Sequence, residues 1–132
     1  MDLNNITDYS NIKKFSLNNI ICNAKIIKVY DGDSITAIFE YKNELYKWNC
    51  RLTGIDTPEI KTKDENEKKI AIIARDALND KIINKIVKLH CYDFDKYGRL
   101  LVEIYLEDLH INQWLIDEKY ANKYDGKTKT KW

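Results

Sequence analysis

The chain has 132 residues, of which 44% are hydrophobic and 33% are charged. This length suits one domain with a single core and excludes two independently folded domains of ordinary size. The net charge of +1 excludes a uniformly basic nucleic-acid-binding protein, so any affinity for nucleic acid must come from a local group of side chains. We therefore expect a single functional site.

The N-terminal segment and the cysteines indicate the compartment. Residues 1–19 are polar and include Asp2 and Lys13, where a signal peptide needs an unbroken apolar stretch. No segment approaches the ~18 apolar residues of a membrane-spanning helix. The three cysteines lie far apart, which predicts buried free thiols in a reducing compartment. We expect an intracellular, cytoplasmic monomer that is not attached to a membrane.

The first half of the chain has the pattern of a strand meander. Residues 1–19 are weakly patterned and are predicted to form a polar arm. Alternating apolar residues and aromatic runs then predict strands over residues 20–26, 34–41 and 45–52. The dipeptides Asp31-Gly32 and Lys42-Asn43 lie between these runs and suit hairpin turns.

The second half predicts a helix, a hairpin and a short helix. Pro58 and the lysine-rich residues 61–69 predict a solvated loop. Apolar residues then recur at intervals of three and four, which predicts a helix over residues 67–84 with Ile70, Ile73, Ala74, Ala77, Leu78 and Ile82 on its buried face. Strands are expected near residues 87–92 and 100–106, and a short helix over 111–118, beginning in the Asn112 region.

This element order predicts an α+β chain. Five strands with a helix between strands 3 and 4, and a short C-terminal helix, are the order of a five-stranded OB-fold barrel. The domain is expected to span residues 20–122 and to be followed by a basic tail over residues 123–132. Trp48 and Trp114 are expected in the core.

Three short clusters contain the side chains that a chemical site needs: Asp31-Gly32-Asp33-Ser34, Arg51 with Asp56-Thr57-Pro58-Glu59, and Asp95-Lys96-Tyr97-Gly98-Arg99. Each follows a predicted strand or turn, where sheet proteins present functional groups. Any one of them alone is accounted for by turn chemistry. Together, and in this order, they resemble the staphylococcal nuclease (thermonuclease) family, and the resemblance runs from about Ala24 to Ala121.

The resemblance implies a Ca²⁺ site. Its ligands would be the carboxylates of Asp33 and Asp56 and the carbonyl oxygen of Thr57. Asp31 would not be a ligand and would either support the ligands from outside or form the turn. Calcium accepts oxygen ligands in flexible geometry, and two carboxylates leave positions for water and a phosphate oxygen.

The resemblance also implies the catalytic residues. Arg51 and Arg99 would stabilise charge on the phosphorus, because a planar guanidinium binds two phosphate oxygens at once. Glu59 would hold or deprotonate the attacking water, and the sequence leaves both roles open. Lys96 and Tyr97 would contact a terminal phosphate, with Tyr124 as a further substrate contact.

The expected activity is hydrolysis of phosphodiester bonds in single-stranded or frayed DNA and RNA, leaving 3′-phosphate ends. One alternative is a non-catalytic module that binds nucleic acid or protein, which has no reason to keep these arginines and carboxylates together. Another is an OB fold that binds oligosaccharide or single strands through aromatic residues alone, which leaves the same groups unexplained. His90 and His110 lack the spacing of a zinc site and are given no role.

The C-terminus departs from the secreted bacterial enzymes of this family, which continue into a third long helix. Here Tyr124 is followed by a short lysine-rich tail. In this respect the chain resembles the shorter single-domain forms of eukaryotes and large DNA viruses.

Overall fold

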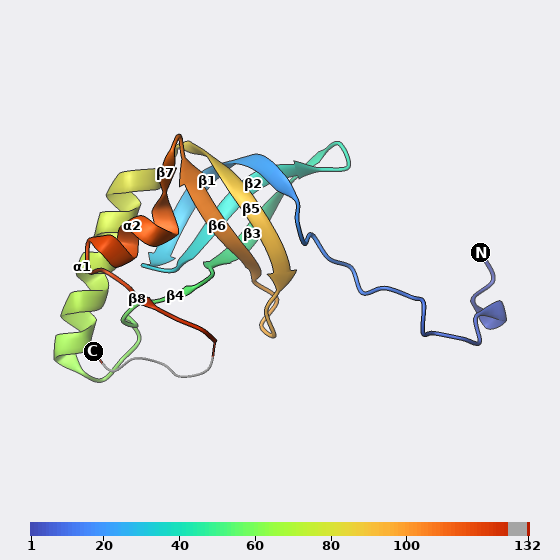
Figure 1. The fold of residues 1–132 in the computed structure, drawn as a ribbon, viewed down its shortest axis with the longest axis horizontal. Coiled ribbons are helices and arrows are strands. Elements are labelled where there is room, and N and C mark those ends of the chain that lie inside the picture. Colours follow the sequence, from blue (N-terminus) through green and yellow to red (C-terminus); the bar gives the residue numbers. More distant parts are fainter. Residues whose placement is uncertain (127–131) are drawn as a thin grey trace.

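Five long strands form a closed mixed barrel, and two helices pack on one side of it (Figure 1). The computed structural model describes residues 1–126 and 132. The barrel strands are β1 (Ile21–Asp31), β2 (Ser34–Tyr41), β3 (Glu44–Leu52), β5 (Ile86–Phe94) and β6 (Leu100–Leu106). Their antiparallel order is β3-β2-β1-β5-β6, and a parallel pairing between β3 and β6 closes the barrel. The predicted OB-like α+β architecture is confirmed.

Several shorter elements were not predicted, because strands of two residues carry no readable alternation. They are the 3₁₀ turn η1 (Leu3–Asn5), β4 (Ile55–Asp56), β7 (Leu109–His110) and β8 (Asn122–Lys123). β4 pairs with β8, so that Asp56 lies opposite Asn122. This small ladder holds the segment that carries Asp56 and Thr57 against Asn122 and Lys123.

Both predicted hairpin turns are present. Lys42 and Asn43 have φ angles of 50° and 70°, the left-handed conformation that a two-residue turn of type I′ requires. The other turn consists of Gly32 and Asp33, one residue later than the predicted Asp31-Gly32, because Asp31 still pairs with Ser34. A Cβ atom on Gly32 would lie 3.0 Å from the Thr57 Cγ2 atom and 3.1 Å from the Ala74 Cβ atom. Glycine therefore lets this turn pack closely against the segment after β4 and against the long helix.

The long helix, α1 (Glu65–Ile82), begins earlier than predicted. The Asp64 carboxylate accepts hydrogen bonds from the N–H groups of Asn66 (2.9 Å) and Glu67 (3.3 Å), which is an N-cap. Residues 65–69 thus form the first helical turn, and the prediction of a loop there was wrong.

The buried face of α1 also differs from the prediction. It consists of Ala71, Ala74, Leu78 and Ile82. Ile70 and Ile73 were expected to be buried, but they are 39% and 58% exposed. Ala74, Leu78 and Ile82 are buried as predicted, and the Gly32 turn packs closely against the helix at Ala74.

The short helix, α2 (Ile111–Asp117), is tied to the barrel by one buried side chain. Asn112 lies in the first turn of the helix and is 3% exposed. Its Oδ1 atom accepts a hydrogen bond from Ile104 N (3.0 Å), and its Nδ2 atom donates to the carbonyls of Thr53 (2.9 Å) and Val102 (3.2 Å). Asn112 therefore links α2 to β6 and to the residues that follow β3.

The N-terminal residues lead away from the barrel (Figure 1). They are mostly exposed up to Ser16, whose hydroxyl donates to the Asp93 carboxylate, and Leu17 is then buried with the core. Residues 127–131 of the predicted basic tail lie outside the described residues. No helix in the described part of the chain is long and apolar enough to cross a membrane.

The cysteines and tryptophans only partly follow expectation. All three cysteines are free, but Cys22 is half-buried, whereas Cys50 and Cys91 are buried. Trp48 and Trp114 are partly buried and pack against the core from its edge. Trp48 stacks on Phe39 with ring centroids 4.6 Å apart.

Candidate active site

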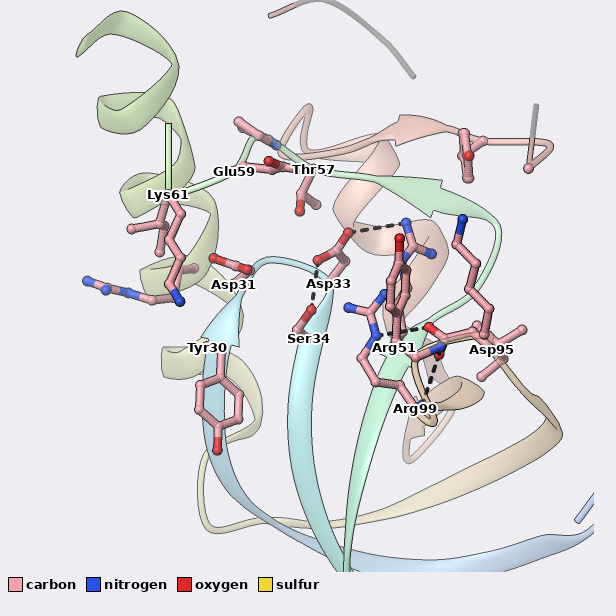
Figure 2. A pocket seen from close by; sticks show the side chains of 18 residues that line it. Tyr30, Asp31, Asp33, Ser34, Arg51, Thr57, Glu59, Lys61, Asp95 and Arg99 are labelled. Carbon is pink, nitrogen blue, oxygen red and sulfur yellow. Dashed lines mark hydrogen bonds and ion pairs between the residues drawn. The ribbon is translucent and has the colours of Figure 1, made fainter. Parts of the chain in front are cut away.

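A pocket of about 830 Å³ lies where the β1–β2 turn, the segment after β4 and the β5–β6 turn meet (Figure 2). Most of the predicted site residues line it: Asp33, Arg51, Thr57, Glu59, Lys96, Tyr97, Arg99 and Tyr124. Asp56 does not line it, and this residue is only 2% exposed. The three sequence clusters are thus brought to one end of the barrel.

Asp33 lies between an arginine and a group of acidic residues. Its Oδ2 atom is 3.4 Å from Arg51 Nη2, and its Oδ1 atom accepts a hydrogen bond from the Ser34 hydroxyl at 3.1 Å. Burial raises the pKa of Asp33 above its ordinary value, Arg51 and Ser34 oppose this, and the charges of Asp31 and Asp56 raise it further. Three carboxylates therefore lie within electrostatic reach of one another.

The Arg51 guanidinium is held by backbone as well as by Asp33. Its Nη1 atom donates to the Leu52 carbonyl (3.1 Å) and its Nη2 atom to the Ile55 carbonyl (3.2 Å). Its Cζ atom lies 5.6 Å from the centroid of the Tyr124 ring. Several donors pointing in fixed directions are needed for this arrangement, which a lysine cannot supply.

Arg99 is oriented by Asp95. The Arg99 Nε atom donates to Asp95 Oδ2 at 2.9 Å, and Asp95 Oδ1 accepts from the backbone N–H groups of Tyr97 and Arg99, each at 2.9 Å. Burial alone would raise the pKa of Asp95, but these hydrogen bonds and the Arg99 charge outweigh burial and lower it. Asp95 belongs to the third sequence cluster, but no role was predicted for it.

Lys96 and Tyr97 lie beside Arg99 at the rim. The Tyr97 side chain is strongly exposed, and its ring centroid is 5.2 Å from Lys96 Nζ and 5.6 Å from Arg99 Cζ. Two positive charges thus flank one aromatic ring at the pocket mouth, an arrangement that suits contact with a phosphate and a base.

The acidic side of the pocket faces the arginines. In Figure 2, Arg51 and Arg99 lie on one side of Asp33. On the other side of Asp33 lie Asp31, Thr57 and Glu59. Burial raises the pKa of Asp31, a hydrogen bond from the Ile60 backbone opposes this, and the Glu59 charge adds to it. The backbone N–H of Glu59 donates to Glu67 Oε2 at 3.2 Å, so the first turn of α1 helps to position this segment.

The donor set is compatible with calcium. The Thr57 Oγ1 atom is buried and finds no hydrogen-bond partner among the described residues. This unpartnered hydroxyl belongs to the residue whose carbonyl oxygen is the expected ligand, and with the mutually interacting charges of Asp33 and Asp56 the surroundings are all-oxygen, of the kind that calcium prefers. No group of three or more His, Cys, Asp or Glu side chains suited to a metal ion occurs within residues 1–126 and 132, and the predicted set contains only two such side chains.

Among the pocket-lining residues that were not predicted and lie outside the three sequence clusters, three carry polar or charged side chains: Tyr30, Lys61 and Arg75. Tyr30 directly precedes the first cluster, and Lys61 follows the second, so proximity in the sequence could have indicated both. Arg75 follows Ala74 on α1, and its position depends on how the helix docks at Gly32. His90 and His110 contact the Tyr105 ring and do not line the pocket.

The sequence profile described as "Staphylococcal nuclease homologue" matches residues 49–131. A probable staphylococcal-like nuclease of rice (Oryza sativa subsp. japonica), CAN3, is 35% identical over 75 residues, covering 57% of this chain and 18% of the rice protein. An uncharacterized endonuclease of Escherichia coli O157:H7 is 28% identical over 102 residues, which cover 76% of this chain and 60% of the Escherichia coli protein. An uncharacterized protein of Methanocaldococcus jannaschii, MJ1439, is 28% identical over 124 residues, which cover 76% of this chain and 58% of that protein. The chain thus spans less than two thirds of each relative.

Proposed function

The chain belongs to the staphylococcal nuclease family, and from this premise we propose that it is a calcium-dependent nuclease. Its substrates are single-stranded or frayed DNA and RNA, in which it hydrolyses phosphodiester bonds. The nuclease names of the rice and Escherichia coli relatives support the same class of activity.

The observation that carries this proposal is the division of charge across one pocket. Two guanidinium groups lie on one side of Asp33, and Glu59 lies on the other side (Figure 2). A phosphodiester placed between them meets cations where negative charge develops and a carboxylate where water must lose a proton.

The arginines have distinct tasks. Arg51 is fixed by the carbonyls of Leu52 and Ile55, so it can bind phosphate oxygens without first being ordered. Arg99 is held through Nε alone, and none of the described residues takes a hydrogen bond from its Nη atoms. These remaining donors are available to a phosphate from the side of the β5–β6 turn.

Glu59 holds or deprotonates the attacking water. The water oxygen forms a bond to phosphorus, the bond from phosphorus to the 5′ oxygen breaks, and the leaving 5′ oxygen takes a proton from solvent. The phosphate then stays on the 3′ side. Asp33, Asp56 and the Thr57 carbonyl would hold calcium, which when bound polarises the phosphate and helps to place the water.

The substrate is broad in this proposal. Arginines and an activated water require only a phosphodiester, so DNA and RNA both serve. Unpaired strands are preferred, because exposed aromatic rings such as Tyr97 can stack on bases only when the bases are not paired in a duplex.

The test is a cleavage assay on single-stranded DNA and RNA in calcium, magnesium and chelator, with an Arg51→Lys preparation alongside to detect contaminating nuclease. We expect cleavage in calcium, little in magnesium and none in chelator, since magnesium demands stricter octahedral geometry. Full activity in chelator would overturn the calcium dependence. No cleavage of either substrate in calcium would overturn the nuclease function in favour of a binding module.

A further inference from the structure

A second hollow adjoins the pocket on the outer surface of the barrel. It has a volume of about 280 Å³ and shares Tyr30, Asp31, Ser34 and Arg99 with the main pocket. It extends along β2 and β3 as far as Asn49. A chain-like ligand in the main pocket can therefore continue into it.

The strand register places this hollow one step from the proposed cleavage site. Ser34 pairs with Arg51, and two residues further along the strands Thr36 pairs with Asn49. Since side chains two residues apart on a strand share a face and lie about 7 Å apart, Thr36 and Asn49 are the next pair on the face that carries Ser34 and Arg51. Thr36 is only 5% exposed, and Asn49 lines the hollow. This is within reach of the neighbouring nucleotide of a bound strand.

A set of polar groups orders the hollow. The Thr36 hydroxyl donates to Asn49 Oδ1 at 3.0 Å and lies 3.3 Å from the Tyr30 hydroxyl. The bond to Oδ1 fixes the orientation of the Asn49 amide. Its Nδ2 atom has no acceptor among the described residues, which leaves two N–H donors for a ligand.

Tyr30 supplies an exposed ring beside this amide. It lies at an irregularity in the pairing of β1 with β2, between Val29 and Asp31, and is 45% exposed. Lys28 Nζ lies 4.4 Å from its ring centroid. An aromatic ring with a lysine at its face is the combination with which proteins bind single-stranded nucleic acid.

We propose that Tyr30 and Asn49 form a nucleobase subsite, which takes the base of a nucleotide next to the phosphodiester being cut. The base stacks on the Tyr30 ring, the Asn49 amide donates to an acceptor on the base edge, and Lys28 attracts the phosphate of that unit. The position of this subsite relative to the cleaved bond rests on the proposed nuclease function. Because a base must be unpaired to stack on Tyr30, the subsite also accounts for a preference for unpaired strands, independently of the residues proposed to perform the cleavage.

The test is the affinity of the full chain for a fluorescently labelled, hydrolysis-resistant phosphorothioate oligodeoxythymidine, measured by anisotropy in chelator. Tyr30→Ala should weaken binding by roughly 5- to 100-fold, the effect of losing one base–aromatic stack. Tyr30→Phe should keep most of the affinity, and Asn49→Ala should lose part of it. The matched control is Tyr46→Ala, because Tyr46 is also 45% exposed but lies at the far end of β3.

A second probe separates base from backbone. On an abasic strand of the same length, Tyr30→Ala and the unaltered chain should bind equally, since the stack is absent in both. Equal affinities of Tyr30→Ala and Tyr46→Ala for oligodeoxythymidine would overturn the subsite, as would failure of the unaltered chain to bind. A chain that binds with this pattern but cleaves nothing in calcium would overturn the nuclease function and leave the subsite standing.

Discussion

Asn112 and Thr57 are both almost fully buried polar residues, 3% and 2% exposed, yet their polar atoms have opposite surroundings. Each polar atom of the Asn112 side chain is hydrogen-bonded, to Ile104, Thr53 and Val102. The Thr57 hydroxyl has no partner in the described part of the chain, and nearby Asp33 has its pKa raised by burial.

The difference separates two uses of buried polar groups. A buried polar group without a hydrogen-bond partner lowers stability. The fully hydrogen-bonded side chain of Asn112 therefore stabilises the fold. Under the proposed function, the polar groups around Thr57 and Asp33 are kept for a ligand, at the expense of stability. The pocket should therefore lose function without losing stability when altered, and the Asn112 region should do the reverse.

The largest expected effect concerns Glu59. Glu59→Gln keeps the shape of the side chain but removes the charge that we propose acts on water, so kcat should fall about 10²- to 10⁴-fold. Calcium and nucleotide binding should persist. Activity should not return when calcium is raised, whereas Asp33→Asn should be partly rescued. Equal rescue of both variants would place Glu59 among the metal ligands.

Arginine replacements come next. Arg51→Lys and Arg99→Lys should each lower turnover on the order of 10²-fold or more, because oriented donors to the transition state are lost. Arg75→Lys is the comparison, since Arg75 pairs with Asp76 and has no assigned role in the chemistry; its loss should be much smaller. Near-normal turnover in either of the first two variants would reduce that arginine to a packing residue.

Asn112→Ala should lower stability and leave turnover almost unchanged, the opposite of the arginine replacements. Removing its side chain leaves buried groups of Ile104 and Thr53 without their partner, which should lower the free energy of unfolding by about 2–4 kcal/mol. Chemical denaturation measures this effect. Turnover per folded molecule should change little, and a loss as large as that of Arg51→Lys would break the distinction between the two regions.

The smallest effect compares two threonines. Thr57→Val replaces an unpartnered hydroxyl by a methyl group, and the free energy of unfolding should stay the same or rise slightly. Thr36→Val removes a hydroxyl bonded to Asn49 and should cost about 1 kcal/mol. If Thr57→Val is the less stable variant, the Thr57 hydroxyl has a structural partner in solution.

Sequence patterns predicted the barrel well because its strands alternate over many residues and its turns carry Gly32 and Lys42-Asn43. They missed the start of α1, although Asp64 followed three residues later by Glu67 is a helix-start signal. They placed Ala74, Leu78 and Ile82 correctly on the buried face of α1 but wrongly added Ile70 and Ile73, because spacing alone does not show how wide a stripe of the helix the barrel covers. No local pattern distinguishes Asn112 from an exposed helix residue.

The site residues that could be predicted from the sequence lie almost entirely within the three sequence clusters. Asp33, Arg51, Glu59 and Arg99 lie in short clusters, and the barrel brings them together. The role of Asp95 in orienting Arg99 required the geometry of the β5–β6 turn. Arg75 reaches the pocket through the docking of α1, a contact between distant parts of the chain that periodicity does not encode.

Calcium titration by calorimetry tests most directly whether the buried polar groups of the pocket are kept for a ligand. Near neutral pH the unaltered chain should bind one ion, Asp33→Asn should bind more weakly, and Asp95→Asn, whose carboxylate orients Arg99, should bind as before. Because burial raises the pKa of Asp33, protons should compete with calcium at a higher pH than at an ordinary carboxylate, and affinity should fall as the pH is lowered. Absence of binding by the unaltered chain, or equal affinities of Asp33→Asn and Asp95→Asn, would contradict the account.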